Sequence, residues 1–160
     1  MATIQELSPD VRAFVSAYGW QRIDPVPWAP LRVPLQEARV GLVVTACMTM
    51  PDQPPFQADR PGNDPSIRIV PEAMSPSILV NTFPGQAFDH AGLAADANLL
   101  VPIDRLRDLE ILGEIAGVTP RVVSLCGHLP KPKRLMEETA PEVAAMFVED
   151  GADVVVLVPA

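Results

Sequence analysis

Two runs without a charged residue, residues 40–46 and residues 154–158, constrain the fold most strongly. Strands that are covered on both faces in a parallel sheet read as continuous apolar stretches, so both runs predict buried strands of an α/β fold. In such folds, ligands bind beyond the carboxyl ends of the strands. Only Pro159 and Ala160 follow the second run, so we expect this strand to end where a catalytic turn begins.

The N-terminal part of the chain predicts a short helix and an extended arm. Ser8 and Pro9 are residue types that favour the cap and the first position of a helix, and apolar residues follow at helical spacing. Residues 20–38 contain four prolines and should run extended. We expect Trp20 and Trp28 to pack against the surface of the protein.

The remaining residues predict alternating strands and helices. A capping box over residues 139–142 predicts the start of the last helix, and the proline-rich residues 50–65 predict a long loop. Further strands are expected at residues 67–70, 77–81 and 121–126, and helices at residues 102–112 and 139–147. The predicted fold is a three-layer α/β sandwich with a mostly parallel, Rossmann-like sheet. We expect a helix and proline-rich arm over residues 1–37, an α/β domain over residues 38–160, and one compact domain overall.

Composition and charge exclude several classes of function. The 160 residues are 48% hydrophobic and carry a formal net charge of −8. Nucleic acids and anionic membranes bind basic patches, so neither is an expected partner. No signal peptide or membrane-spanning run is present in this sequence, which predicts a cytoplasmic protein. Cys47 and Cys126 lie far apart in sequence, and we expect both to be free thiols.

The strand ends bring a small set of reactive residue types to one rim of the predicted sheet. If the strands at 40–46, 77–81, 121–126 and 153–158 are parallel, two thiols and two imidazoles lie near their carboxyl ends. Such residues can bind Zn²⁺, which leaves a zinc enzyme as one alternative; its ligands are Cys47, His90, Cys126 and His128. Structural roles in packing and loop hydrogen bonding are the other reading of these residues. No glycine-rich phosphate loop and no nucleophile elbow is present.

Several stretches together give a more specific indication. In their order and spacing, they resemble component B of the glycine, sarcosine, betaine and D-proline reductases, a family of selenoproteins. The resemblance covers roughly residues 38–160. Its segments are residues 38–43, 51–56, 63–66 with Arg68 and Ile69, 89–92, 96–98, 102–107, 139–142 and 150–153.

The resemblance implies a selenol- or thiol-dependent reductase that reductively cleaves a small amine or amino-acid derivative. In the family, a U-x-x-C or C-x-x-C redox motif follows a strand like residues 154–158. Selenocysteine is encoded by UGA, so we expect this chain to stop just before a selenocysteine and to be inactive as given. The chain itself should hold no cofactor. His90, Asp96 and Asn98 match motif positions and, with Cys126, are the expected catalytic residues.

The resemblance also implies partners. These are a thiol or selenol electron-donor protein and a subunit that carries a pyruvoyl group. Without a helix after it, the last strand should keep one apolar face uncovered, which predicts a homo-oligomer. A non-catalytic scaffold protein of the same fold is the alternative from a different functional class.

Overall fold

The computed structural model describes residues 3–19, 23–57, 64–83, 90–127, 129 and 131–159. The chain divides into two compact units, Met1–Pro30 and Leu31–Ala160. None of the helices in the described ranges is long and apolar enough to cross a membrane.

The first unit contains η1 (Ile4–Glu6) and the helix α1 (Pro9–Ala17). The predicted start of α1 is confirmed, because Ser8 Oγ accepts a hydrogen bond from the backbone N–H of Val11 at 3.4 Å and Pro9 is the first helical residue. Trp28 is 87% exposed and does not pack within its own unit, and its packing against the rest of the protein stays a prediction. The flanking prolines hold this stretch extended, and Trp20 lies outside the described residues.

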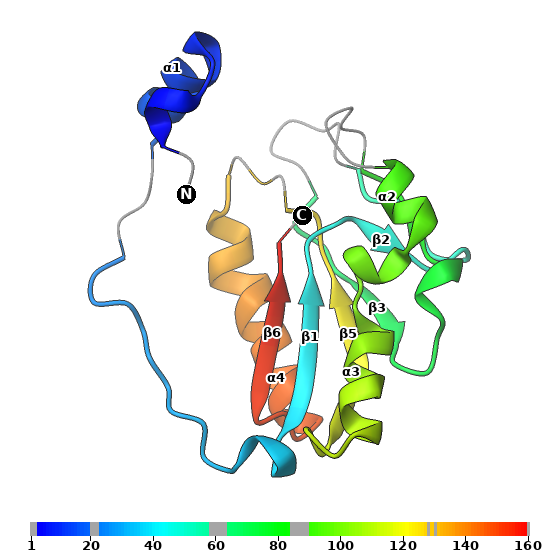
Figure 1. The fold of residues 1–160 in the computed structure, drawn as a ribbon. Coiled ribbons are helices and arrows are strands. Elements are labelled where there is room, and N and C mark those ends of the chain that lie inside the picture. The colour runs from blue at the N-terminus through cyan, green and yellow to red at the C-terminus, as the bar shows by residue number, and fades with distance from the viewer. Residues whose placement is uncertain are drawn as a thin grey trace. The chain divides into compact units, whose positions relative to one another are not determined.

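The second unit is built on a four-stranded, mostly parallel sheet, which confirms the predicted fold class (Figure 1). The strand order is β3-β5-β1-β6, where β1 pairs in parallel with both β5 and β6, and β3 pairs antiparallel with β5. The strands are β1 (Arg39–Val44), β3 (Arg68–Pro71), β5 (Gly117–Ser124) and β6 (Val154–Val158).

Helices cover both faces of this sheet (Figure 1). Because successive side chains of a strand point to opposite faces, Leu42 joins a core cluster with residues of α3 (Ile103–Ile111), whereas Val43 joins one with residues of α4 (Ala140–Glu149). The predicted third layer is therefore present. The short elements are η2 (Leu35–Glu37), β2 (Met48–Thr49), η3 (Pro76–Ile78), β4 (Val80–Asn81), α2 (His90–Ala95), η4 (Ala97–Leu99) and η5 (Leu135–Thr139).

Two predicted elements differ from the structure. Residues 77–81 are not a strand of the main sheet, because Pro76 opens the turn η3 and the short β4 pairs antiparallel with β2 instead. The capping box at residues 139–142 is also absent. Thr139 lies inside continuous helical backbone, since η5 precedes α4, and its hydroxyl donates to the carbonyl oxygen of Pro65 at 3.0 Å.

The last strand is the second edge of the sheet and is less buried than its sequence predicts. In β6, Val155 and Val156 are each 38% exposed and Leu157 is 70% exposed. The apolar run fits an interior strand, but β1 is its single strand partner within the described residues. Val155 and Leu157 also line an apolar pocket of about 330 Å³ beside α4.

The packing of α4 on the sheet depends on the absence of a side chain at Gly41. A Cβ atom at this position would lie 2.7 Å from Cδ1 of Phe147, and Phe147 is 3% exposed. The aromatic ring therefore rests directly on the backbone of β1.

We expect Gly41→Ala to destabilise the Leu31–Ala160 unit by about 1–3 kcal/mol, because the ring must move away from an overpacked site. Phe147→Leu should offset part of this loss in the double variant. Chemical denaturation measures both effects. Gly19→Ala is the matched control, since nothing lies within 4 Å of the Cβ position there; equal losses for both glycine variants would contradict this packing.

Candidate functional site

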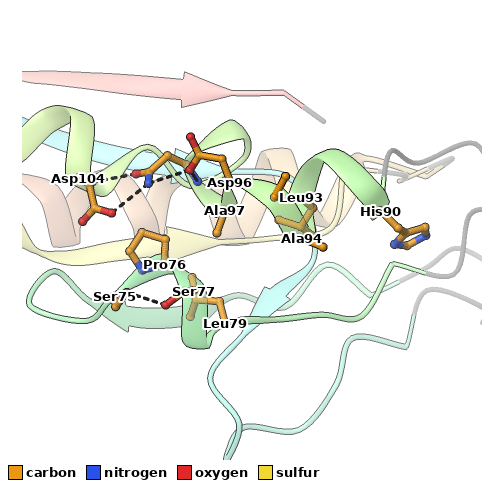
Figure 2. Close-up of a pocket in the computed structure, with 12 residues that line it drawn as sticks. Ser75, Pro76, Ser77, Leu79, His90, Leu93, Ala94, Asp96, Ala97 and Asp104 are labelled. Atoms are coloured by element: carbon orange, nitrogen blue, oxygen red, sulfur yellow. Dashed lines mark hydrogen bonds between the residues drawn. The ribbon is translucent and has the colours of Figure 1, made fainter.

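A pocket of about 390 Å³ lies between the η3 segment, α2, η4 and the start of α3 (Figure 2). Three of the four predicted catalytic residues, His90, Asp96 and Asn98, line this pocket. The sequence resemblance therefore selected residues that the fold brings together. The lining is completed by Ser75, Pro76, Ser77, Leu79, Leu93, Ala94, Ala95, Ala97 and Asp104.

His90 and the acidic residues occupy opposite ends of this pocket (Figure 2). His90 is the first residue of α2 and is exposed. Ser75 and Ser77 share a hydrogen bond of 2.8 Å between their hydroxyls on the η3 side. An imidazole, two hydroxyls and carboxylates thus surround one cavity.

Asn98 joins the two carboxylates of the pocket. Its backbone and side-chain N–H groups donate to Asp96 Oδ1 at 2.9 and 3.1 Å, and the side-chain amide also donates to Asp104 Oδ2 at 2.9 Å. Asn98 Oδ1 accepts from the backbone N–H of Asp104 at 3.0 Å. An amide side chain offers a donor and an acceptor, so it can satisfy both a carboxylate and the N–H at the start of α3.

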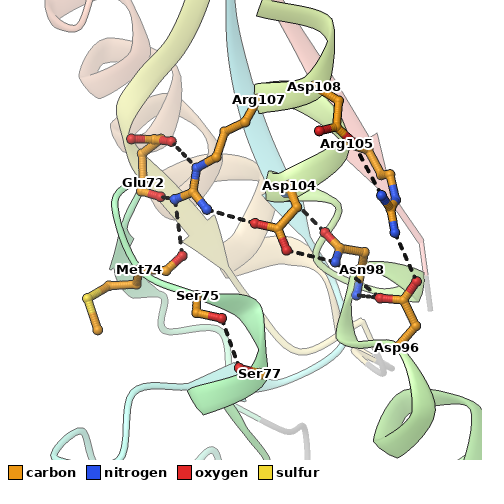
Figure 3. Close-up of polar contacts among 10 residues, drawn as sticks. All are labelled: Glu72, Met74, Ser75, Ser77, Asp96, Asn98, Asp104, Arg105, Arg107 and Asp108. Atoms are coloured by element: carbon orange, nitrogen blue, oxygen red, sulfur yellow. Dashed lines mark hydrogen bonds and ion pairs between the residues drawn. The ribbon is translucent and has the colours of Figure 1, made fainter. Parts of the chain in front are cut away.

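Arg107 anchors this network to the η3 side (Figure 3). Its guanidinium pairs with Glu72 at 2.7 Å and with Asp104 at 2.8 Å. It also donates to the carbonyl oxygens of Glu72 and Met74. Burial lowers the pKa of Arg107, but the hydrogen bonds and charges of Glu72 and Asp104 outweigh burial and raise it. Arg107 therefore stays charged and fixes the loop that forms one wall of the pocket.

Asp96 keeps a negative charge at the mouth of the pocket. The backbone N–H of Asn98 lowers the pKa of Asp96 most, followed by the Asn98 amide, and Arg105 adds an ion pair at 3.3 Å. The arrangement of charged carboxylates and hydroxyls suits a small ligand with an amine group. Glu72 and Arg107 were missed by the sequence reasoning, because an ion pair that links a loop to a helix 35 residues later has no local sequence signal.

The fourth predicted catalytic residue, Cys126, lies elsewhere. It forms a disulfide with Cys47, which corrects the expectation of two free thiols. The two residues are 79 positions apart, but each follows the end of one of two neighbouring parallel strands, so the fold places their Cα atoms 4.4 Å apart. Cys126 cannot act as a thiolate in this state.

The alternative zinc site loses two of its four ligands to this disulfide. His128 lies outside the described residues. Within the described ranges, no group of three or more His, Cys, Asp or Glu side chains could hold a metal ion.

The pocket network makes a prediction for acid stability. Because the pKa of Asp96 lies below its ordinary value of 3.8 in the folded state, ionised Asp96 stabilises the fold above about pH 4, and this contribution is lost as the pH falls through the folded pKa. Asp96→Asn should therefore lower the melting temperature at neutral pH, and the difference from the original protein should shrink below pH 3. Asp108→Asn, which removes only an exposed pair with Arg105, is the control. A constant difference at all pH values contradicts the prediction.

Comparison with known proteins shows that the chain is similar in sequence to a reductase subunit. The D-proline reductase subunit gamma of Acetoanaerobium sticklandii is 31% identical to this chain over 136 residues, which is 84% of the chain and 54% of that protein. The chain thus spans about half the length of this curated relative. No family model matches the chain, and no solved structure matches it. Over most of its length, the chain is related to a reductase subunit.

Proposed function

We propose that this chain is a component of a thiol- or selenol-dependent reductase that cleaves a carbon–nitrogen bond in a small amine or amino-acid derivative, with D-proline as the first candidate. The 31% identity to the D-proline reductase subunit gamma over 84% of the chain carries this proposal. The pocket supports it, because Asp96 and Asp104 can attract an ammonium group. The specific assignment to component B is part of the same proposal.

The proposed reaction balances with a dithiol as the reductant. D-proline gains two electrons and two protons, its ring carbon–nitrogen bond breaks, and 5-aminopentanoate forms while the dithiol becomes a disulfide. Here a selenolate, which its low pKa keeps ionised near neutral pH, attacks the α-carbon, so that a carbon–selenium bond forms as the carbon–nitrogen bond breaks. One thiol of the dithiol then attacks the selenium, and the carbon leaves and takes a proton. The second thiol attacks the sulfur of the selenium–sulfur bond, which frees the selenol and leaves the disulfide. In this proposal, Asp96 orients the substrate and the His90 imidazole gives the departing nitrogen its proton.

A gene deletion in the native host tests the function. Loss of the gene should abolish the conversion of D-proline to 5-aminopentanoate, and the original gene should restore it. His90→Gln should restore about a hundredth of the rate or less, the low end of the effect of losing a positioned acid–base group, and Asp96→Asn should also lower the restored rate because the substrate is no longer oriented. Asp108→Asn, a carboxylate outside the pocket lining, should restore it fully. Unchanged proline reduction in the deletion strain overturns the proposal.

The intact mass of the protein from the same host tests the selenol. A mass above 17.2 kDa with the isotope pattern of selenium is expected. The predicted pyruvoyl subunit should co-purify with the tagged protein in this preparation, identified by its own mass.

Self-association is the second part of the proposed assembly. The outer edge of β6 carries no charge between Val154 and Val158, and uncharged, exposed edge strands pair readily with another strand. Antiparallel pairing of two β6 strands joins two copies by a two-fold axis, so that each copy contributes the same surface.

Leu157→Lys should convert the oligomer to a monomer, because a charged side chain on an edge strand blocks strand pairing. Light scattering after size-exclusion chromatography at micromolar concentration measures the change. Ile111→Lys replaces an 84% exposed residue at the end of α3 and is the control that should keep the oligomer. A monomer before any substitution contradicts the prediction.

A further inference from the structure

The disulfide lies at the rim where the three parallel strands end. Cys47 follows β1 and Cys126 follows β5, and Ala46 and Cys126 form an isolated bridge between the two segments. The end of β6 lies on the other side of the same loop, since Thr45 N–H donates to the carbonyl oxygen of Val158 at 3.1 Å. This is the edge of an α/β sheet at which reactive groups collect.

The backbone around Cys47 is held in a form that a cysteine rarely adopts. Its φ angle is +52°, and it is the one non-glycine residue with positive φ among the described residues. Such a conformation is strained for a residue with a side chain and persists only where the surroundings enforce it. Here Cys47 N–H donates to the carbonyl oxygen of Leu125 at 3.0 Å, and Thr82 donates to the Cys47 oxygen through its N–H at 3.1 Å and its hydroxyl at 2.8 Å.

Aromatic side chains cover the two sulfur atoms. Both cysteines are 0% exposed and pack in a separate small cluster with Phe56 and the half-buried Phe83. The guanidinium of Arg68 stacks on the Phe56 ring at 4.3 Å and holds it in place. Phe56 is buried whereas Phe83 is half-buried, so displacement of Phe83 is the shorter route by which a thiol reaches the disulfide.

We propose that Cys47 and Cys126 form a redox-active pair that exchanges two electrons with a dithiol protein of the thioredoxin type. A donor thiolate attacks one sulfur, the Cys47–Cys126 bond breaks and a mixed disulfide forms. The second donor thiol then displaces the cysteine, which leaves two thiols on this chain and a disulfide on the donor. This inference rests on the proposed function, because a reductase of this kind needs electrons from thiols.

Residues 79–82 connect the pair to the pocket. The Asn81 side-chain amide donates to the carbonyl oxygen of Ala46 at 2.8 Å, Thr82 binds Cys47 as described, and Leu79 lines the pocket. β4 also pairs with β2 directly after Cys47. Reduction breaks the covalent bond between Cys47 and Cys126. In this proposal, a shift of Cys47 is passed through residues 79–82 to the pocket wall that contains Leu79.

Equilibration of the purified protein with reduced and oxidised thioredoxin, without oxygen, tests the pair. Acid quenching and alkylation followed by mass spectrometry count the thiols, and Cys47→Ser/Cys126→Ser provides the zero level. We expect an equilibrium constant within about tenfold of unity, since structural disulfides are more stable than this against reduced thioredoxin. A pair that stays mostly oxidised at a tenfold excess of reduced over oxidised thioredoxin, or two thiols that stay mostly reduced at a tenfold excess of oxidised thioredoxin, overturns the proposal.

Phe83→Ala tests the route of access. It should speed reduction by about tenfold or more, because less free energy is needed to expose the sulfurs. Phe14→Ala, on the exposed side of α1, should leave the rate unchanged, and equal rates for all three proteins would refute the role of Phe83. The measurements separate this inference from the proposed function: thiol exchange without a proline phenotype refutes only the reductase, and a proline phenotype with an inert disulfide refutes only the redox pair.

Discussion

The fold depends on the double pairing of β1. This strand is hydrogen-bonded to β5 on one side and to β6 on the other, in parallel with both, and its side chains alternate between two cores. Parallel neighbours end at the same rim, so the pairing alone fixes where the loop of residues 45–47 meets the segments after β5 and β6. The meeting of Cys47 and Cys126 at that rim therefore depends on the register of β1.

The pocket is held by a different kind of interaction, a chain of charges and amides. Arg107 connects the loop at Glu72 to α3, and Asp104 and Asn98 continue the chain to Asp96 (Figure 3). Each polar group has a partner in its neighbour, so the positions of the carboxylates are fixed. For the ligand binding that we propose, such a preformed surface reduces the conformational free energy that binding must supply.

The sequence predicted the elements whose signal is local. Residues 40–46 and 121–126 have the apolar pattern of buried strands, and both strands are present, although β5 begins earlier, at Gly117. Apart from the capping box at residues 139–142, where the helical backbone continues through Thr139, the failures concern relations between distant residues. Residues 77–81 have the composition of a strand, yet their partner is the short β2 and not the main sheet, and no local pattern states a strand's partner.

The residues of the candidate site were predicted only in part. His90, Asp96 and Asn98 fall within nine residues, so a motif could select them together, and they line one pocket. The hydrogen bonds of Asn98 to Asp104 also show that Asn98 supports the start of α3, a structural role that a motif does not reveal.

Cys47 and Cys126 come together because β1 and β5 are parallel neighbours. The sequence predicted parallel strands, but it did not predict that these two cysteines pair. A pair that seemed unrelated by its spacing thus becomes the one covalent link between two strand ends. That link is tied through residues 79–82 to the wall of the acidic pocket. One wall segment thus contacts both the disulfide and the place where we propose that the substrate binds, which is the contact that the proposed coupling between them requires.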